Sequence, residues 1–406
     1  MVSGLAAHPE IHSRCGIDTV EIARVRKMLD AMPEDALERL FSADELRDAG
    51  EGLRRAASLA ARFAAKEACL KLFPRETALA TISAADFSVS RDNFGAPRVI
   101  CSEKASTVLG RYRVDRIELS MTHDRASASA IALPVPRTTQ VPLCGRILYR
   151  LLPYRRNVIR ENLRRAFGDR VPETEIERLA AAHYGHLWRL LKEFLFYPLV
   201  PAAKRLQLAR VENLDGLLRA LEQGKGALVL TGHFGSFEIS TAAAIASFPE
   251  ARGRFYFLRR PFKPKWLDAY VTRRFQRAGF GVLPRRGSLQ WLLDRLAAGD
   301  MVVFPFDQHA VGRDGIPIEF FGYPAATFRS LALIAQASGA PVVPAASWRE
   351  PDGSHVLRFE EALPYVERGD FDDEVRTNTR AYNAALERLI VRHPEQWWWV
   401  HRRWKL

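Results

Sequence analysis

Cysteine is scarce in this 406-residue sequence, and the four that occur lie too far apart to form a metal-binding or redox motif: Cys15, Cys69, Cys101 and Cys144. Their spacing excludes a disulfide-stapled secreted scaffold and favours reduced thiols in a cytosolic compartment. No apolar run approaches the ~18 residues of a membrane-spanning helix. In the first thirty residues no basic segment precedes an apolar one, so we expect no signal peptide. The sequence also has no internal repeat and no low-complexity tract. Hydrophobic residues make up 48% of the chain, which suffices for packed cores.

Acidic residues are under-represented in only one part of the chain. Residues 1–135 contain 19 basic and 19 acidic residues, so the whole net charge of +13 lies in the remainder. A basic half favours an anionic partner, such as a nucleic acid, an acidic protein or an anionic membrane surface. The proline-rich stretch Leu133–Pro142 has no helical period and separates the two halves. We therefore predict a first domain over 1–133, a linker over 134–144 and a second domain over 145–406.

Hydrophobic periodicity predicts a different fold class for each half. In the first half, apolar residues at three-and-four spacing alternate with short strand-like runs, which indicates an α+β domain. The predicted segments are helices over 21–32 and 57–73 and strands within 86–101, 116–123 and 126–134. The second half begins with basic helices over 156–169 and 175–196. From Gly226 onward strands and helices alternate, and this predicts an α/β domain with a largely parallel or mixed sheet.

Two acidic residues are prominent in the first half. Asp18 follows a short apolar start in GIDTVEI, and Glu67 lies within the predicted helix ARFAAKEACLKLF. Glu67 and Lys71 are four residues apart and are expected to share a helix face with Arg62 and Lys66 one turn earlier. Taken alone, such a helix is most simply a solvated charged surface.

The order of several short motifs adds a resemblance. GIDTVEIARV, FSADE, RFAAKEACLK, DNFGAP and SMTHD resemble the holo-acyl-carrier-protein synthase type of 4′-phosphopantetheinyl transferase over residues 14–133. The resemblance implies transfer of the phosphopantetheine arm of coenzyme A to a serine of an acyl carrier protein. It further implies specific roles: Asp18 and Glu67 as Mg²⁺ ligands, Lys71 and Arg62 against phosphate, Arg24 against the carrier protein, and His123 at the nucleotide end of coenzyme A. Two carboxylates suit Mg²⁺ on a pyrophosphate.

A second constellation lies at GALVLTGHFGSFE, residues Gly226–Glu238. Gly232 and Gly235 bracket His233, so the chain can turn sharply after the strand and leave the imidazole accessible. If a helix begins near Ser236, Glu238 lies in its first turn and can orient His233 as a general base. Since no G-x-S-x-G elbow is present, the expected nucleophile is a substrate hydroxyl or amine.

This half resembles the lipid A late (lauroyl/myristoyl) acyltransferase family over roughly residues 145–405. The matching stretches are H-x4-E after the strand, NLRRAFG, FLRRPFKPKWLD, FPFDQHAVG, FFGYPAATFR and the ending HPEQWWWVHRRWK. The resemblance implies that His233 is the base and Glu238 its partner. It also implies that Arg260 binds a phosphate of the acceptor and that Asp307 shapes the acceptor site.

Two departures limit what the second resemblance implies. In place of the family's apolar anchoring helix the chain has only LCGRILYRLLPYRR, which has the basic-and-leucine pattern of an interfacial helix, so we expect peripheral contact with an anionic membrane. Ser236-Phe237 replaces the more usual Asn-Trp, so lipid A itself is not inferred as acceptor. The tryptophan- and arginine-rich ending also suits stacking of nucleic-acid bases. No nucleic-acid motif accompanies it, so packing and membrane contact are favoured.

The two resemblances together predict a bifunctional enzyme on the cytoplasmic face of a bacterial inner membrane. The first domain would load an acyl carrier protein with its thiol arm, using coenzyme A and Mg²⁺. The second would transfer an acyl chain from the carrier thioester to a hydroxyl of a lipid acceptor. The alternative is an acyl-CoA lysophospholipid acyltransferase whose first domain only docks the carrier protein. A non-enzymatic membrane scaffold is a further alternative.

Overall fold

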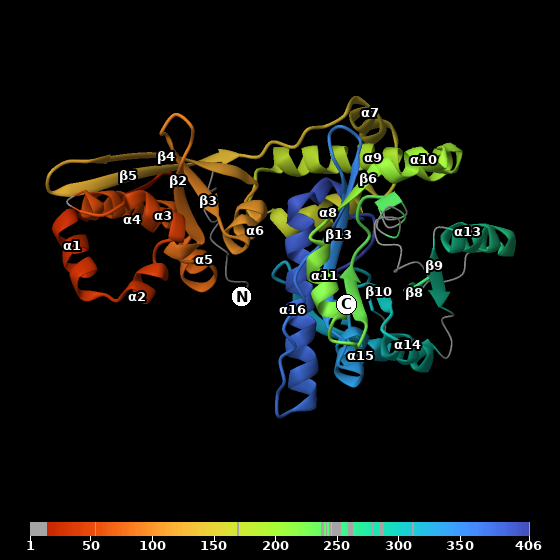
Figure 1. The fold of residues 1–406 in the computed structure, drawn as a ribbon. Helices are drawn as coiled ribbons and strands as arrows, with labels where there is room; N and C mark the ends of the chain where they lie inside the picture. Colours follow the sequence, from red (N-terminus) through yellow and green to blue (C-terminus); the bar gives the residue numbers. More distant parts are fainter. Residues whose placement is uncertain are drawn as a thin grey trace, which may run out of the picture. The chain divides into compact units, whose positions relative to one another are not determined.

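The computed structural model describes residues 14–405 except positions 53, 169, 237, 238, 241, 243, 244, 246–252, 259–262, 278, 284–287 and 311. The chain forms two compact units, each described here by itself (Figure 1). The first unit comprises residues up to Thr139 together with Phe167–Ile176, and the second comprises Gln140–Ala166 and Glu177–Leu406.

The first unit packs helices against one face of a small antiparallel sheet. The sheet has strand order β1-β5-β4, and β2 and β3 form a separate antiparallel hairpin. Its elements are β1 (Gly16–Glu21), α1 (Ile22–Ala31), α2 (Glu34–Glu38), α3 (Ala43–Ala49), α4 (Arg55–Lys71), α5 (Arg75–Thr81), β2 (Phe87–Arg91), β3 (Pro97–Cys101), α6 (Glu103–Arg111), β4 (Val114–His123) and β5 (Ser127–Pro136). The predicted helices and strands of this half are all present.

Helix α4 forms the centre of the first core because alanines line its buried face. Ala60, Ala64 and Ala68 are fully buried and pack in one cluster with alanines of β5. These small side chains let the helix lie close to the sheet. A Cβ at Gly16 would lie 1.9 Å from the carbonyl oxygen of Ala68, so only glycine fits at the start of β1. This close approach brings the beginning of β1 next to the end of α4.

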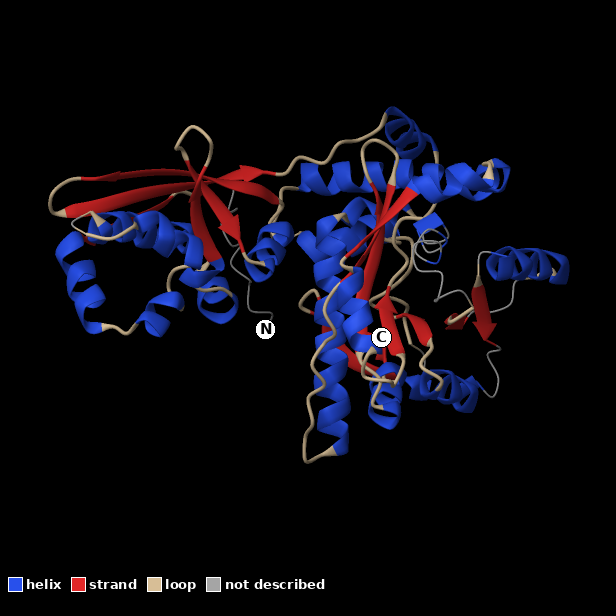
Figure 2. Cartoon of the chain, viewed as in Figure 1, coloured by secondary structure: helices blue, strands red, loops and turns tan. Residues whose placement is uncertain are grey.

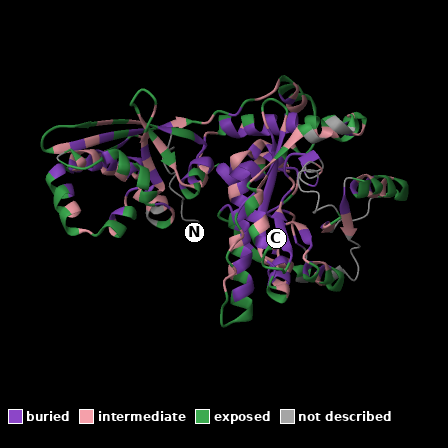
Figure 3. Cartoon of the chain, in the orientation of Figure 1, coloured by how far each residue is buried: buried purple, intermediate pink, exposed green. Residues whose placement is uncertain are grey.

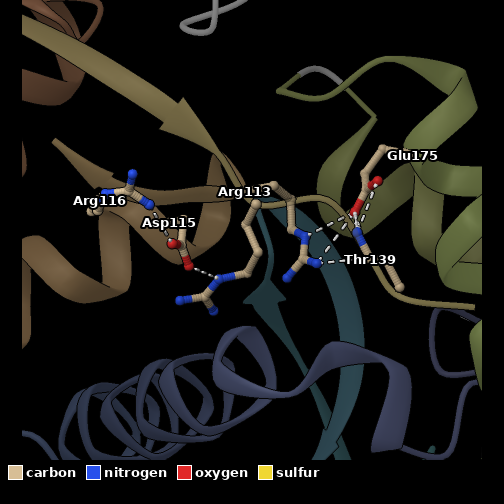
Figure 4. Close-up of polar contacts among 6 residues, drawn as sticks. Arg113, Asp115, Arg116, Thr139 and Glu175 are labelled. Carbon is tan, nitrogen blue, oxygen red and sulfur yellow. Dashed lines mark hydrogen bonds and ion pairs between the residues drawn. The ribbon is translucent and has the colours of Figure 1, made fainter. Parts of the chain in front are cut away.

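The predicted linker is partly ordered. Strand β5 continues to Pro136, which is paired with Val114. The prolines are tolerated because β1 pairs with β5 only as far as Ala132, so the missing N–H groups fall where β5 is an edge strand. Beyond the strand, Thr139 donates through its amide (3.1 Å) and hydroxyl (2.5 Å) to the carboxylate of Glu175 at the start of α9 (Figure 4).

Buried Arg113 completes this cluster. Its guanidinium donates to Thr139 Oγ1 at 2.7 Å and to Glu175 Oε1 at 3.2 Å (Figure 4). The carboxylate of Glu175 therefore binds both Arg113, directly before β4, and Thr139, just after β5. This explains why segment 167–176, which follows the predicted domain boundary in sequence, belongs to the first compact unit.

We expect Glu175→Ala to destabilise the first unit by about 3–5 kcal/mol, because it removes the carboxylate that pairs with the buried Arg113 guanidinium at 3.2 Å. Glu118→Ala is the matched control, since Glu118 forms an exposed ion pair with Arg116 whose loss should have little effect on stability. All eight tryptophans lie at or after position 188, outside the first unit. Urea unfolding of the first unit should therefore change the ellipticity of the protein and leave its tryptophan fluorescence unchanged. An equal urea midpoint of unfolding for Glu175→Ala and Glu118→Ala would contradict this interpretation.

The second unit is an α/β domain with a mixed seven-stranded sheet of order β6-β14-β13-β7-β10-β8-β9 (Figure 2). Its elements are α7 (Leu143–Leu151), α8 (Arg156–Phe167), α9 (Glu173–Phe196), α10 (Ala202–Arg205), β6 (Ala209–Glu212), α11 (Leu214–Leu221), β7 (Ala227–Thr231), β8 (Phe255–Leu258), α13 (Lys265–Arg277), β9 (Phe280–Leu283), α14 (Ser288–Ala297), β10 (Met301–Pro305), β11 (Gly315–Phe320), β12 (Tyr323–Phe328), α15 (Ser330–Ser338), β13 (Val342–Arg349), β14 (His355–Phe359) and α16 (Phe371–Arg392). This confirms the predicted fold class.

Strand β7 lies at the centre of this sheet and is buried on both faces. Ala227 and Val229 pack in a cluster with α11 and α13, whereas Leu228 and Leu230 pack with α14, α15 and α16. An uninterrupted apolar sequence is what a strand with helices on both sides requires. Among the described residues no helix combines the length and apolarity needed to cross a bilayer.

Candidate active sites

The ends of two adjacent parallel strands place His233 beside Asp307. Strand β7 pairs in parallel with β10, and Thr231 lies opposite Pro305 at their carboxyl ends. His233 and Asp307 each follow two residues later, so both lie at the edge where ligands bind in open α/β sheets. A Cβ at Gly232 would lie 3.0 Å from Asp307 Oδ2, so glycine allows the carboxylate to approach this turn.

Asp307 is held by three hydrogen bonds. His233 Nδ1 lies 2.8 Å from Asp307 Oδ1, and the backbone amide of His233 donates to Oδ2 at 2.6 Å. The indole of Trp397 also donates to Oδ2, at 2.9 Å. The Asp307 side chain is only 3% exposed, whereas that of His233 is 33% exposed. A buried carboxylate thus fixes one side of an imidazole whose other side is accessible.

The charge of Asp307 raises the pKa of His233, although burial of the ring opposes this shift. Burial alone would raise the pKa of Asp307, but the neighbouring imidazole and the hydrogen bonds hold it below its ordinary value. Asp307 therefore remains ionised and accepts the Nδ1 proton of His233. The neutral imidazole then carries its free lone pair on Nε2, which is the state a general base requires.

Gln308 lies next to His233 Nε2, and His401 lies near the His233–Asp307 pair. The amide nitrogen of Gln308 is 3.4 Å from His233 Nε2, so it points toward the atom that would take a proton. The pKa of His401 is lowered by burial, and its electrostatic interactions with Asp307 and His233 place it near the pair. Gln308 is a donor that can contact an oxygen bound beside Nε2.

The carboxyl-terminal segment closes the other side of the turn after β7. The amide of Trp398 donates to the carbonyl of His233 at 3.1 Å, and Phe234 forms an antiparallel bridge with Trp397. Trp397, Trp399 and Trp404 are buried, with the rings of the first two perpendicular at 4.5 Å. All three indoles therefore serve packing, and that of Trp397 also positions Asp307.

In the first unit, the close approach of β1 and α4 brings Asp18, Glu67 and Lys71 together. Lys71 Nζ donates to Asp18 Oδ1 at 2.7 Å and to the carbonyl of Ile17 at 2.8 Å. Burial and then the neighbouring charge of Asp18 raise the pKa of Glu67, while Lys71 partly opposes this shift. Two carboxylates from different elements therefore share one partly exposed position with a lysine.

This donor set fits Mg²⁺. Mg²⁺ is usually bound by one or two carboxylates together with substrate phosphates and water, so the pair Asp18 and Glu67 is sufficient. The repulsion that raises the pKa of Glu67 is what a bound divalent cation would relieve. No group of three or more acidic, histidine or cysteine ligands occurs in the described ranges of the chain.

Three other predicted site residues of the first unit have different surroundings. Arg24 on α1 and His123 at the end of β4 are exposed, as contact with a partner requires. Arg62 is buried instead: its guanidinium donates to Ser58 Oγ at 2.5 Å and forms an ion pair with Asp48. This burial is at odds with the predicted contact between Arg62 and a substrate phosphate.

Two predicted residues of the second unit, Glu238 and Arg260, lie outside the described residues. Their roles stay predictions. Asp307 was expected to shape the acceptor site, and the structure places it directly against His233. Neither Gln308 nor the hydrogen bond of Trp397 to Asp307 was predicted from the sequence. The sequence does place FDQ directly after a predicted strand. This position indicates a partner for His233 only when that strand is known to lie beside β7.

Comparisons with known proteins match each half of the chain to a different family. A model described as bacterial lipid A biosynthesis acyltransferase matches residues 131–406, and a model of the 4′-phosphopantetheinyl transferase superfamily matches residues 14–128. Lipid A biosynthesis palmitoleoyltransferase of Escherichia coli strain K12 is 28% identical over 257 residues, which is 63% of this chain and 80% of that protein. Holo-[acyl-carrier-protein] synthase of Moorella thermoacetica is 37% identical over 118 residues, which is 29% of this chain and 90% of that protein. A crystal structure of the Helicobacter pylori holo-[acyl-carrier-protein] synthase in complex with coenzyme A aligns with 28% identity, covering 30% of this chain and 99% of that chain, with a TM-score of 0.25.

Proposed function

The chain belongs to the bacterial lipid A biosynthesis acyltransferase family through residues 131–406 and to the 4′-phosphopantetheinyl transferase superfamily through residues 14–128, and we propose that it couples two transfer reactions around one acyl carrier protein. Both domains are enzymatic, and the chain is a bifunctional transferase. The first domain transfers 4′-phosphopantetheine from coenzyme A to a serine of the carrier. The second transfers an acyl chain from the carrier thioester to a hydroxyl of a lipid acceptor.

The acyl transfer follows from the state of His233. Nε2 takes the proton of the acceptor hydroxyl while Asp307 stabilises the imidazolium that forms. The oxygen attacks the thioester carbonyl to form the ester bond, the C–S bond breaks, and the departing thiolate takes the proton back from Nε2. The Gln308 amide, 3.4 Å from Nε2, is a side-chain donor that can contact the developing oxyanion. Glu238 stays a predicted partner of His233.

One observation carries this proposal: a buried, ionised Asp307 fixes Nδ1 of an accessible imidazole and raises its pKa. A histidine that only packed in the core would be neutral and enclosed, as His183 is, whose pKa burial lowers to about 4. The pairing of a buried carboxylate with a partly exposed imidazole is the arrangement that a general base needs.

For the arm transfer, Asp18 and Glu67 are the residues that would hold Mg²⁺. When bound there, the ion would neutralise charge on the pyrophosphate of coenzyme A. Lys71 already lies against Asp18 and can donate to a phosphate oxygen. The serine oxygen forms the new bond to phosphorus, the pyrophosphate bridge breaks, the adenosine bisphosphate leaves, and the serine proton goes to solvent. Exposed Arg24 would face the acidic carrier protein.

Peripheral contact with an anionic membrane is supported by exposed apolar side chains in the second unit. They lie on α7, on the carboxyl-terminal part of α9 and on α13, which Figure 3 shows largely in its exposed and intermediate colours. They are Leu143, Ile147, Leu151, Trp188, Leu191, Phe194, Leu195, Phe196, Trp266 and Tyr270. Apolar faces flanked by basic residues bind at the headgroup boundary. We place this contact on the cytoplasmic face of the bacterial inner membrane, where a carrier protein and a lipid acceptor would meet.

The test uses the purified full chain with a bacterial lipid extract and either acyl carrier protein thioester or acyl-CoA. We expect a new acylated lipid by mass spectrometry with the carrier thioester, and its loss in His233→Ala, while the arm of coenzyme A is still added to apo-carrier protein. Transfer only from acyl-CoA, without arm addition, would favour the lysophospholipid acyltransferase with a docking domain. Unchanged lipid products in His233→Ala would contradict the assignment of the base.

A further inference from the structure

Gln396 joins the carboxyl-terminal segment to strand β13 through its side-chain amide. Its Oε1 accepts from the backbone amide of Arg349, the last residue of β13, at 2.7 Å, and its Nε2 donates to the carbonyl of Arg349 at 2.9 Å. Gln396 and Arg349 are each only 7% exposed, so both hydrogen bonds are shielded from water. Buried backbone groups need partners, and here one side chain satisfies both groups of one strand residue.

Arg349 is itself held firmly, so it can serve as an anchor for Gln396. Its guanidinium donates to the two carboxylate oxygens of Glu193 on α9, from Nε at 2.6 Å and from Nη2 at 2.5 Å. A largely buried two-point ion pair of this kind fixes the orientation of both side chains. Trp348, the preceding strand residue, also stacks on His393, with ring centroids 4.8 Å apart. The carboxyl-terminal segment is therefore attached to β13 at two neighbouring positions.

The chain at and directly after Gln396 contacts both parts of the His233 site. The carbonyl of Gln396 accepts from the amide of Gly235, in the turn that carries His233, at 3.1 Å. The next residue, Trp397, donates through its indole to Asp307 Oδ2 at 2.9 Å. Gln396 thus links three elements that are distant in sequence: strand β13, the turn after β7 and, through Trp397, the segment after β10 that carries Asp307.

The Trp397 indole holds Asp307 from outside the His233 turn. The other two hydrogen bonds of the carboxylate come from His233 itself, through Nδ1 and the backbone amide, so they would shift together with that residue. The indole is a donor with a separate attachment. We propose that Gln396 is a positioning residue of acyl transfer, which holds this indole where it fixes Asp307 against the imidazole. The inference rests on the proposed acyl transfer and adds to it a residue that acts without touching the substrate.

The test compares Gln396→Met with Asn378→Leu in the full chain. Asn378 of α16 is fully buried in the same unit, and its amide likewise accepts from the backbone amide of Val366 at 3.0 Å and donates to the carbonyl of Val366 at 2.8 Å. Each variant removes one buried amide that pairs with the backbone of one residue, so both should lower the urea midpoint of unfolding. We expect only Gln396→Met to lower kcat of acyl transfer, by about 10–100-fold, with little change in KM for the carrier thioester.

The pKa of His233, measured by NMR titration without substrates, supplies a readout that does not depend on turnover. Because Asp307 raises this pKa, a less firmly held carboxylate should let it fall toward its ordinary value in Gln396→Met but not in Asn378→Leu. Trp397→Phe removes the indole donor and keeps an aromatic ring in its place. If Gln396 acts through Trp397, adding Gln396→Met to Trp397→Phe should cause little further loss of kcat.

Equal changes in kcat for Gln396→Met and Asn378→Leu would overturn the proposal, as would an unaltered His233 pKa in a folded Gln396→Met protein or full additivity with Trp397→Phe. Should Gln396→Met fail to fold, Gln396→Asn keeps the amide but shortens the side chain by one methylene, and the same comparisons apply. Absence of acyl transfer in the unaltered protein would contradict the proposed function alone, because the titration of His233 still decides the role of Gln396.

Discussion

Replacing Asp307 by asparagine is expected to lower the rate of acyl transfer about 10³–10⁴-fold while leaving phosphopantetheine transfer unchanged. Asparagine keeps the size of the side chain but removes the charge that raises the pKa of His233. Its amide nitrogen can also donate to Nδ1, which would place the ring proton on Nε2, in the wrong tautomer for a base. The measurement is the initial rate of lipid acylation with the carrier thioester.

The pH dependence of Asp307→Asn separates this role from a loss of folding. In the unaltered enzyme the base is protonated below the raised pKa of His233, so kcat/KM falls as the pH falls through that value. Without the carboxylate the pKa of His233 is lower, so the remaining activity falls only at lower pH. NMR titration of His233 reports the same shift independently of turnover. Asp372→Asn, an exposed aspartate on α16, is the control and should change neither quantity.

Replacing Glu67 by glutamine should reduce phosphopantetheine transfer roughly 10²–10⁴-fold, which corresponds to the loss of several kcal/mol of electrostatic stabilisation. Asp18→Asn should have a similar effect, because the two carboxylates would hold the same ion. The mass gain of apo-carrier protein measures the reaction. Glu51→Gln, which changes an exposed carboxylate of the same unit, should leave the rate unaltered.

The same pair of carboxylates predicts a competition between protons and Mg²⁺. Since burial and Asp18 raise the pKa of Glu67, lowering the pH protonates Glu67 earlier than an ordinary glutamate. The Mg²⁺ concentration needed for half-maximal transfer should therefore rise as the pH falls, and this dependence should weaken in Glu67→Gln. A rate of transfer that does not depend on Mg²⁺ in either the unaltered enzyme or Glu67→Gln would contradict the assignment of Asp18 and Glu67 as metal ligands.

Helix α4, which carries Glu67, shows what the hydrophobic periodicity of the sequence can and cannot predict. The three-and-four spacing in residues 57–73 predicted α4 to within two residues at each end. The expectation that all four charged residues share one face is wrong, because at about 100° per residue Arg62 and Lys66 share one face, and Glu67 and Lys71 share another. Which of the two charged faces is buried does not follow from the spacing. The fold buries Lys66, which pairs with Glu45 at 2.8 Å, and leaves Lys71 exposed against Asp18.

The boundary between the units shows a similar limit. The proline-rich composition of 133–142 predicted an unstructured connection, yet β5 continues to Pro136 and Thr139 is bound to Glu175. A residue 36 positions later in the chain supplies this contact, so composition within the segment could not indicate it.

The order of residues along the chain was enough to predict the two fold classes, the two family resemblances and His233 as the candidate base, because periodicity and short motifs are local properties. The partner that the described structure gives to this histidine was not available from that order. Asp307 lies far along the chain, and it reaches the imidazole only because β10 hydrogen-bonds beside β7 in the sheet. Strand adjacency is set by packing of the whole domain, since both faces of β7 must be covered by helices before its neighbours are fixed.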